Sequence, residues 1–242
     1  MDSIYKKRLG SLFCVTKKWV GIAYYSEAEM DLMISYYGVP SDRLLNLTAA
    51  PIYRFEPAES ISKGPIMSIG VAKRDYQTLI AALQDLPSHE TEIYLSSRYG
   101  DIYKGGSLDK IPEWVRFEKM VSDEELVKRY MRARFIVLPL TDTTHFSAGV
   151  SVALEASAAG KAVIATKTQG MSSYVIEGVT GLLVPPYDSE AMQEAINKLW
   201  DNPNLAHQMG LAGREYVERK FNPVTVDQDL KQFLIDVYHE SK

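Results

Sequence analysis

Apolar runs of strand length alternate with stretches of helical spacing from Pro65 onward, and this alternation constrains the fold more than any other feature. Such a pattern predicts an α/β domain with a parallel sheet, because a helix must cross back over the sheet between one strand and the next. Helices are then expected on both faces of the sheet. The predicted strands are residues 66–70, 92–96, 114–117, 135–140, 163–166 and 181–184.

Helix signals fill the gaps between these strands and continue after the last one. Ser122 and Glu125 have the spacing of a capping box, and Asp188 or Ser189 is a suitable cap for a later helix. Pro223 follows a stop signal and begins a final helix. The predicted helices are residues 76–86, 122–133, 149–159, 189–202, 204–221 and 224–238.

The N-terminal part of the chain differs from the rest. It contains a helix-like segment at 4–19, a strand-like segment at 20–25, a helix opened by Ser26 and a strand at 43–47. A segment of this size buries little of its own surface, so it is expected to be the remnant of another domain. The predicted division is 1–60 for the remnant and linker, 61–222 for the main domain, and 223–242 for a C-terminal helix.

Composition excludes several classes of protein. Hydrophobic residues make up 46% and charged residues 24% of the 242 positions, and the formal net charge is −4, which argues against a nucleic-acid surface. Cys14 is the only cysteine, so no disulfide can form within the chain and no cysteine cluster can bind a metal. We therefore expect a cytoplasmic protein. No apolar run reaches the ~20 residues that span a bilayer, so contact with the inner membrane face is expected to be peripheral at most.

Glu155 is the most informative single residue. It lies in a predicted helix of small and apolar residues, and Ser151 lies one turn before it on the same face. A diphosphate at the start of this helix would be bound by free amide groups and by the helix dipole. Glu155, ~9 Å further along the helix, could then accept hydrogen bonds from both hydroxyls of a ribose. The alternative is a structural Glu paired with a nearby Lys or backbone donor; we favour the site, because a carboxylate among Ala and Leu is costly without a partner.

Two further segments could contact phosphate. Ser147 and Gly149 precede the same helix, and small residues allow a ligand close to the backbone, although a plain turn explains them equally well. Lys73 or Arg74 follows the first strand of the main domain, at the edge where parallel sheets bind ligands. Without further context, the favoured alternative for Arg74 is a surface pair with Asp75 or another carboxylate.

No Ser-His-Asp order, nucleophile elbow or phosphate-binding loop motif is present, so catalytic residues stay unassigned. His145 follows the fourth strand, but a lone His is more often a surface or packing residue.

The sequence ALEASAAGKAVIAT at 153–166, followed by VIEGVTGLLVPPYD at 175–188, resembles the donor-binding half of family 4 retaining glycosyltransferases, the glycosyl transferases group 1. The resemblance extends to GVAKRDYQTLIAAL at 70–83 and MGLAGREYVERKFN at 209–222. It covers most of this chain but only part of such an enzyme. It implies the GT-B architecture of two facing Rossmann-like domains, here with the N-terminal acceptor domain largely missing.

The resemblance also implies roles for individual residues. Glu155 matches the second Glu of the family's E-x7-E pattern. The first Glu of that pattern contacts the donor sugar, and this chain has Ser147 at its position instead. Arg74 matches a basic residue that binds the donor diphosphate, and Lys119 begins the loop near the nucleobase. The implied donor-binding set is Arg74, Lys119, Met120, Ser147, Gly149, Val150, Ser151 and Glu155.

The resulting prediction is the donor-binding half of a glycosyltransferase, which binds a nucleotide-diphosphate sugar and transfers the glycosyl group to an unknown acceptor. No cofactor or metal is expected, because positive charge and a helix dipole stabilise the leaving nucleotide. The alternative is a non-catalytic subunit that binds a nucleotide sugar or a partner. A separate acceptor-domain chain or a second copy of this chain is the candidate protein partner.

Overall fold

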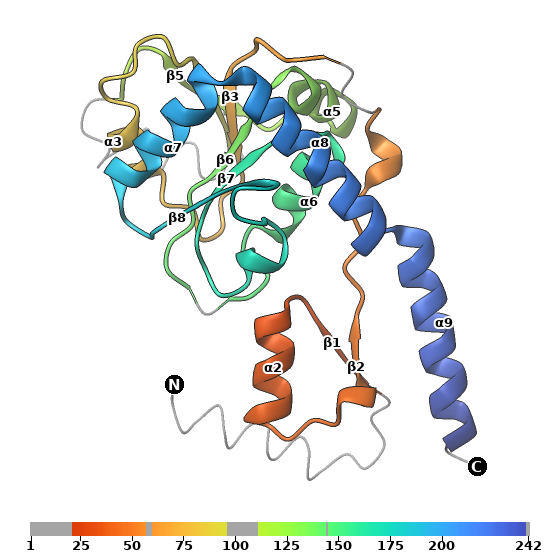
Figure 1. The fold of residues 1–242 in the computed structure, drawn as a ribbon. Helices are drawn as coiled ribbons and strands as arrows, with labels where there is room; N and C mark the ends of the chain where they lie inside the picture. Colours follow the sequence, from red (N-terminus) through yellow and green to blue (C-terminus); the bar gives the residue numbers. More distant parts are fainter. Residues whose placement is uncertain (1–20, 57–59, 96–110, 144, 241–242) are drawn as a thin grey trace.

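The computed structural model describes residues 21–56, 60–95, 111–143 and 145–240, and its main body is a six-stranded parallel sheet (Figure 1). The strand order is β5-β4-β3-β6-β7-β8, so the chain builds outward from β3 in one direction and then from β6 in the other. This reversal leaves a crevice at the carboxyl ends of β3 and β6. The strands are β3 (Ile66–Ile69), β4 (Thr91–Leu95), β5 (Val115–Lys119), β6 (Ile136–Leu138), β7 (Val163–Thr166) and β8 (Gly181–Val184).

Helices cover both faces of this sheet, as the sequence predicts (Figure 1). In β6, Ile136 and Leu138 belong to the apolar cluster beneath α5, α6 and α8, whereas Val137 belongs to the cluster beneath α3 and α7. Burial on both faces explains why the strands read as continuous apolar runs. The helices are α3 (Tyr76–Ala82), α5 (Asp123–Arg132), α6 (Val150–Ala158), α7 (Ser189–Asp201) and α8 (Pro203–Lys220).

A smaller unit precedes the main body. It consists of a parallel pair of strands, β1 (Ile22–Tyr24) and β2 (Leu44–Asn46), with α2 (Glu27–Ser35) between them. The 3-10 turns η1 (Ser41–Arg43) and η2 (Ile52–Arg54) flank β2, and the last helix, α9 (Pro223–Glu240), runs back beside β2 (Figure 1). The predicted division at residues 60 and 222 stays a prediction.

Local chemistry explains where the element boundaries differ from the prediction. The helix predicted to reach residue 86 ends at Ala82, and Leu83 is its C-cap; Pro87 disfavours a helical conformation at residue 86 itself. The strand predicted at 135–140 pairs only over Ile136–Leu138, since Pro139 has no amide hydrogen to donate. Leu140 N–H instead donates to Thr166 Oγ1 at 2.9 Å.

The helix predicted at 4–19 lies outside the described residues. Across the part that the structure describes, none of the helices combines the length and the apolar character needed to cross a bilayer.

Candidate donor-binding site

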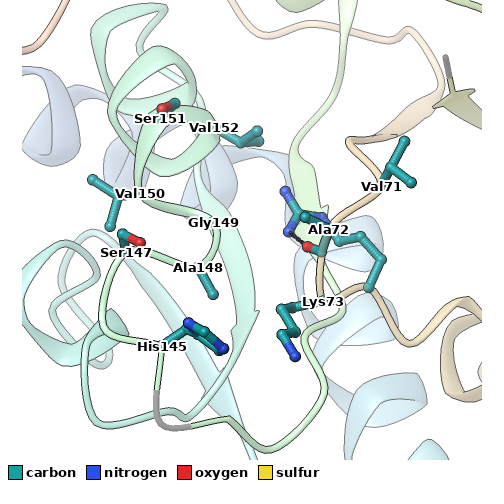
Figure 2. Close-up of a pocket in the computed structure, with 11 residues that line it drawn as sticks. Val71, Ala72, Lys73, His145, Ser147, Ala148, Gly149, Val150, Ser151 and Val152 are labelled. Atoms are coloured by element: carbon teal, nitrogen blue, oxygen red, sulfur yellow. Dashed lines mark hydrogen bonds between the residues drawn. The ribbon is translucent and has the colours of Figure 1, made fainter.

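A cavity of about 430 Å³ opens at the carboxyl ends of β3 and β6. One wall is the loop after β3, and the other is the turn that leads into α6 (Figure 2). Its size is within the range of small-molecule sites, and its place in the sheet is where open α/β folds bind ligands. Its lining consists of Val71, Ala72, Lys73, Arg74, His145, Ser147, Ala148, Gly149, Val150, Ser151 and Val152.

The start of α6 forms the floor of this cavity. Gly149 has a left-handed backbone (φ 81°) and precedes the helix without a side-chain cap. Among the described residues, the amides of Ser151 and Val152 have no hydrogen-bond acceptor, whereas Val150 N–H donates to Ser147 O at 3.3 Å. Free amides at a helix start, together with the helix dipole, stabilise a bound anion.

The opposite wall is held by backbone contacts to the end of β6. Thr141 N–H donates to Lys73 O at 3.0 Å, and Asp75 N–H donates to Pro139 O at 2.9 Å. Lys73 also has a positive φ of 57°, which is uncommon for a residue with a side chain. These contacts fix Lys73 at the cavity, where its side chain is exposed.

Arg74 lies in the cavity wall, as predicted, but it is not the exposed surface residue that the alternative requires. The residue is only 9% exposed, and its guanidinium donates from Nε to Ile69 O at 3.1 Å and from Nη1 to Ala72 O at 2.9 Å. Arg74 is therefore a largely buried residue and not a surface one. Asp75 instead caps α3, where it accepts the Thr78 N–H at 3.1 Å.

A second cavity, of about 500 Å³, adjoins the first and contains Glu155. The two cavities share Ser147, Val150 and Ser151, so both border the start of α6. The other side of the second cavity comes from the segment between β2 and η2, including Thr48 and Arg54. A ligand that passes over the first turn of α6 would reach Glu155 next.

Glu155 faces this open cavity and also has partners within the protein. Tyr130 O–H donates to its Oε2 at 2.8 Å, and Arg54 Nη1 lies 3.8 Å from its Oε1. Burial raises the pKa of Glu155, and the Tyr130 bond and the Arg54 charge oppose this shift. A carboxylate has about four lone-pair positions, so these contacts leave acceptor positions for ligand hydroxyls.

Arg54 and Tyr130 were not identified from the sequence. Arg54 lies in the connection from the smaller unit, and it also pairs with Asp123 Oδ2 at 3.3 Å at the start of α5. Tyr130 is fully buried on the inner face of α5. The one sequence signal for Tyr130 was its position on the apolar face of a predicted helix, because a buried hydroxyl there needs a hydrogen-bond partner.

Two predicted residues lie apart from the others. Lys119 is the last residue of β5, at the outer edge of the sheet, and Met120 follows it with 45% exposure. Neither lines the two cavities. The remaining predicted residues, Arg74, Ser147, Gly149, Val150, Ser151 and Glu155, line one or both of them.

His145 lines the first cavity, although its sequence context favoured a surface or packing role. Figure 2 shows its ring on the side of the turn before α6 that faces Lys73. Within the described ranges, no three His, Cys, Asp or Glu side chains come together as a metal site.

Comparison with known proteins shows which family this chain resembles. Residues 109–216 match the family model described as glycosyl transferases group 1. A D-inositol 3-phosphate glycosyltransferase from Corynebacterium diphtheriae is 35% identical over 102 residues, covering 42% of this chain and 23% of the relative. D-inositol 3-phosphate glycosyltransferase 1 from Catenulispora acidiphila is 27% identical over 209 residues, covering 83% of this chain and 48% of the relative.

Solved structures extend the likeness to nearly the whole chain. Sucrose-phosphate synthase from Thermosynechococcus elongatus superposes with a TM-score of 0.75 and 22% identity, over 97% of this chain and 62% of that one. HepE from Anabaena, solved in complex with UDP and glucose, gives a TM-score of 0.73 and 16% identity, over 95% of this chain and 67% of that one. The chain thus spans less than two thirds of the sucrose-phosphate synthase and about half or less of these curated relatives.

The fold defines the class of protein: a Rossmann-like α/β domain of the GT-B type, preceded by a small α/β unit. Within this domain, residues 109–216 resemble the C-terminal domain of the glycosyl transferases group 1.

Proposed function

We propose that this chain is the donor-binding half of a glycosyltransferase and that it binds a nucleotide-diphosphate sugar across the first turn of α6. The observation that carries the proposal is that both cavities border the first turn of α6, where they share Ser147, Val150 and Ser151. Anion-binding amides lie in one cavity, and a hydroxyl-accepting carboxylate lies in the other.

The ligand would lie across α6 in a definite direction. Its diphosphate would accept hydrogen bonds from the amides of Ser151 and Val152, which have no acceptor within the described residues. Its ribose would donate hydroxyl hydrogens to Glu155, whose orientation Tyr130 fixes. The glycosyl group would then extend into the first cavity, beside Lys73 and His145.

These groups would also promote departure of the nucleotide. When the glycosyl bond breaks, negative charge grows on the diphosphate oxygen that leaves. The α6 dipole and the amides at the start of that helix lie where they would stabilise that charge, and stabilisation of developing charge lowers the barrier directly. This chemistry requires no metal ion.

The acceptor would bind outside the described main domain. In the described part of the chain, the smaller unit has only two paired strands, each three residues long. Parallel sheets are normally larger and covered on both faces. We therefore propose that a further α/β segment, from the same polypeptide or from a separate one, supplies the acceptor site and the residues of catalysis.

Calorimetric titration of the chain with UDP and with GDP tests the proposal. We expect micromolar binding of at least one nucleotide, and UDP is the first choice because the HepE structure contains it. Glu155→Ala should weaken that binding by about ten- to a hundredfold, since a hydrogen bond to a charged group contributes ~1.5–3 kcal/mol.

Two control variants separate binding from folding. Glu155→Gln keeps an acceptor for Tyr130 and should weaken binding less than the Ala variant. Glu194→Ala removes an exposed carboxylate on α7, away from both cavities, and should change nothing. If neither nucleotide binds, or if Glu155→Ala binds as tightly as the unaltered chain, the proposal is wrong.

A further inference from the structure

The first cavity has an unusual charge balance for a sugar site. Its described lining contains Lys73, Arg74 and His145 but no Asp or Glu. Neutral sugars present hydroxyl hydrogens, which carboxylates accept, whereas ammonium, guanidinium and imidazole N–H groups donate to anions. The lining therefore favours an anionic group over a neutral polyol.

The diphosphate accounts for only part of this positive charge. It would be bound at the start of α6 by the backbone amides of Ser151 and Val152. Arg74 lies close to that position, but its Nε and Nη1 already donate to backbone carbonyls. Lys73 and His145 differ, because neither forms an ion pair with any carboxylate of the described ranges, and both side chains reach the cavity.

The placement of these two side chains is the second observation. Glu155 marks one end of the ligand path, and the start of α6 marks its middle. Lys73 and His145 line the first cavity but not the second, and Figure 2 shows them on facing walls: one from the loop after β3 and one from the turn before α6. The glycosyl group of a nucleotide sugar would occupy this end.

The backbone of Lys73 supports a binding role. Its φ of 57° places a long side chain in the left-handed region, where non-glycine residues are disfavoured. Strained residues of this kind persist where surrounding contacts hold them, and they cluster at ligand sites. Here the bond from Thr141 N–H to Lys73 O at 3.0 Å supplies such a contact.

We infer that the donor carries an acidic sugar, a hexuronic acid, whose carboxylate is bound between Lys73 and His145. This inference rests on the proposed function, because it assigns the glycosyl end of the same ligand path. The carboxylate would accept hydrogen bonds from the Lys73 ammonium and from an N–H of the His145 ring. Ser147, on the same turn, would contact the remaining hydroxyls without repelling the charge.

A pair of ligands that differ only at C6 tests the inference. The chain is titrated with UDP, UDP-glucose and UDP-glucuronic acid, which carries a carboxylate in place of the hydroxymethyl group. We expect UDP-glucuronic acid to bind about tenfold more tightly than UDP-glucose, a difference of ~1.4 kcal/mol. If the chain prefers guanosine nucleotides, GDP-mannose and GDP-mannuronic acid replace this pair.

Three variants locate the source of the preference. Lys73→Gln and His145→Gln should each reduce the preference for the acidic sugar at least threefold, with little change in binding of the nucleotide alone. Lys167→Gln removes an exposed lysine beyond the end of β7, outside both cavities, and should leave the preference unchanged.

The outcomes separate the two proposals. Equal affinities for the acidic and the neutral sugar would overturn this inference and leave the proposed function intact. The same holds if Lys73→Gln weakens UDP and both sugars by one common factor, because Lys73 would then serve the diphosphate. If neither UDP nor GDP binds at all, both proposals fail.

Discussion

Replacement of Tyr130 by Phe provides a direct test of how the protein holds Glu155. Tyr130 is fully buried, and its hydroxyl donates to Glu155 Oε2 at 2.8 Å. The other partner, Arg54, is more distant at 3.8 Å. Without the hydroxyl, a largely buried carboxylate loses its closest donor. Hydrogen bonds to charged groups contribute ~1.5–3 kcal/mol, so we expect a loss of unfolding free energy in that range at pH 7.

A double-mutant cycle isolates this interaction from other effects of the substitutions. Urea unfolding at pH 7 is measured for the unaltered chain, Tyr130→Phe, Glu155→Gln and the double variant. Gln accepts a hydrogen bond but carries no charge, so its bond with Tyr130 is worth ~1 kcal/mol. We expect a coupling energy of about 1 kcal/mol or more between the two positions. A coupling energy below ~0.3 kcal/mol, within the additivity error, would refute the reasoning.

The pH dependence of the destabilisation by Tyr130→Phe provides a second check, because the reasoning predicts its direction. Burial raises the pKa of Glu155 above its ordinary value of 4.5, and loss of the opposing Tyr130 bond should raise it further. A carboxyl whose pKa is higher in the folded state destabilises the fold when it ionises, and this cost disappears below the unfolded pKa. The deficit of Tyr130→Phe should therefore shrink as the pH falls from 7 to 4. An equal deficit at both pH values would contradict this explanation.

Two further predictions concern stability. Burial lowers the pKa of Lys161 from 10.5 to about 8, so the folded state releases this proton before the unfolded state does. The unfolding free energy should therefore rise between pH 8 and 10, by ~3 kcal/mol once both states are deprotonated. Urea unfolding of Lys161→Met over the same range should lack this part of the rise. Gly210→Ala should destabilise the protein by ~1–3 kcal/mol, because a Cβ at Gly210 would lie 2.1 Å from the Gly160 carbonyl oxygen. Gly213→Ala on the same helix is the control: its Cβ would meet Ser157 Oγ at an ordinary 3.4 Å, so it should be neutral or stabilising by up to ~1 kcal/mol. A rise with pH that persists in Lys161→Met, or equal effects of the two alanines on thermal unfolding, would contradict these explanations.

The layered fold could be predicted from the sequence because each element carries its own periodic signal. The runs at 163–166 and 181–184 became β7 and β8 with the predicted bounds, and Ser122 and Asp188 cap α5 and α7 through their side chains. These signals are local: they depend on a few neighbouring residues and on burial of both faces of a strand. The order of the strands depends on long-range packing and could not be read in the same way.

The site shows the same limit. Glu155 and the start of α6 could be predicted because one helix carries both. Arg54 comes from a distant segment, and only the packing of η2 near α6 brings it to Glu155. Lys119 was placed by resemblance, but its strand, β5, is the outermost on its side of the sheet and is separated from β3 by β4. Contacts of these kinds are properties of the assembled sheet.

Backbone and side chains contribute differently along the proposed ligand path. In the middle, the groups suited to a diphosphate are amides at the start of α6, and their positions depend on the left-handed backbone at Gly149. Substitutions of neighbouring side chains leave such amides in place, so this part of the path has little power to discriminate between donors. On the proposed path, selection of a ribose would arise from Glu155 at one end, and selection of the sugar from Lys73 and His145 at the other. Since different segments of the chain supply these ends, the preference for a sugar would be able to change without loss of ribose binding at Glu155.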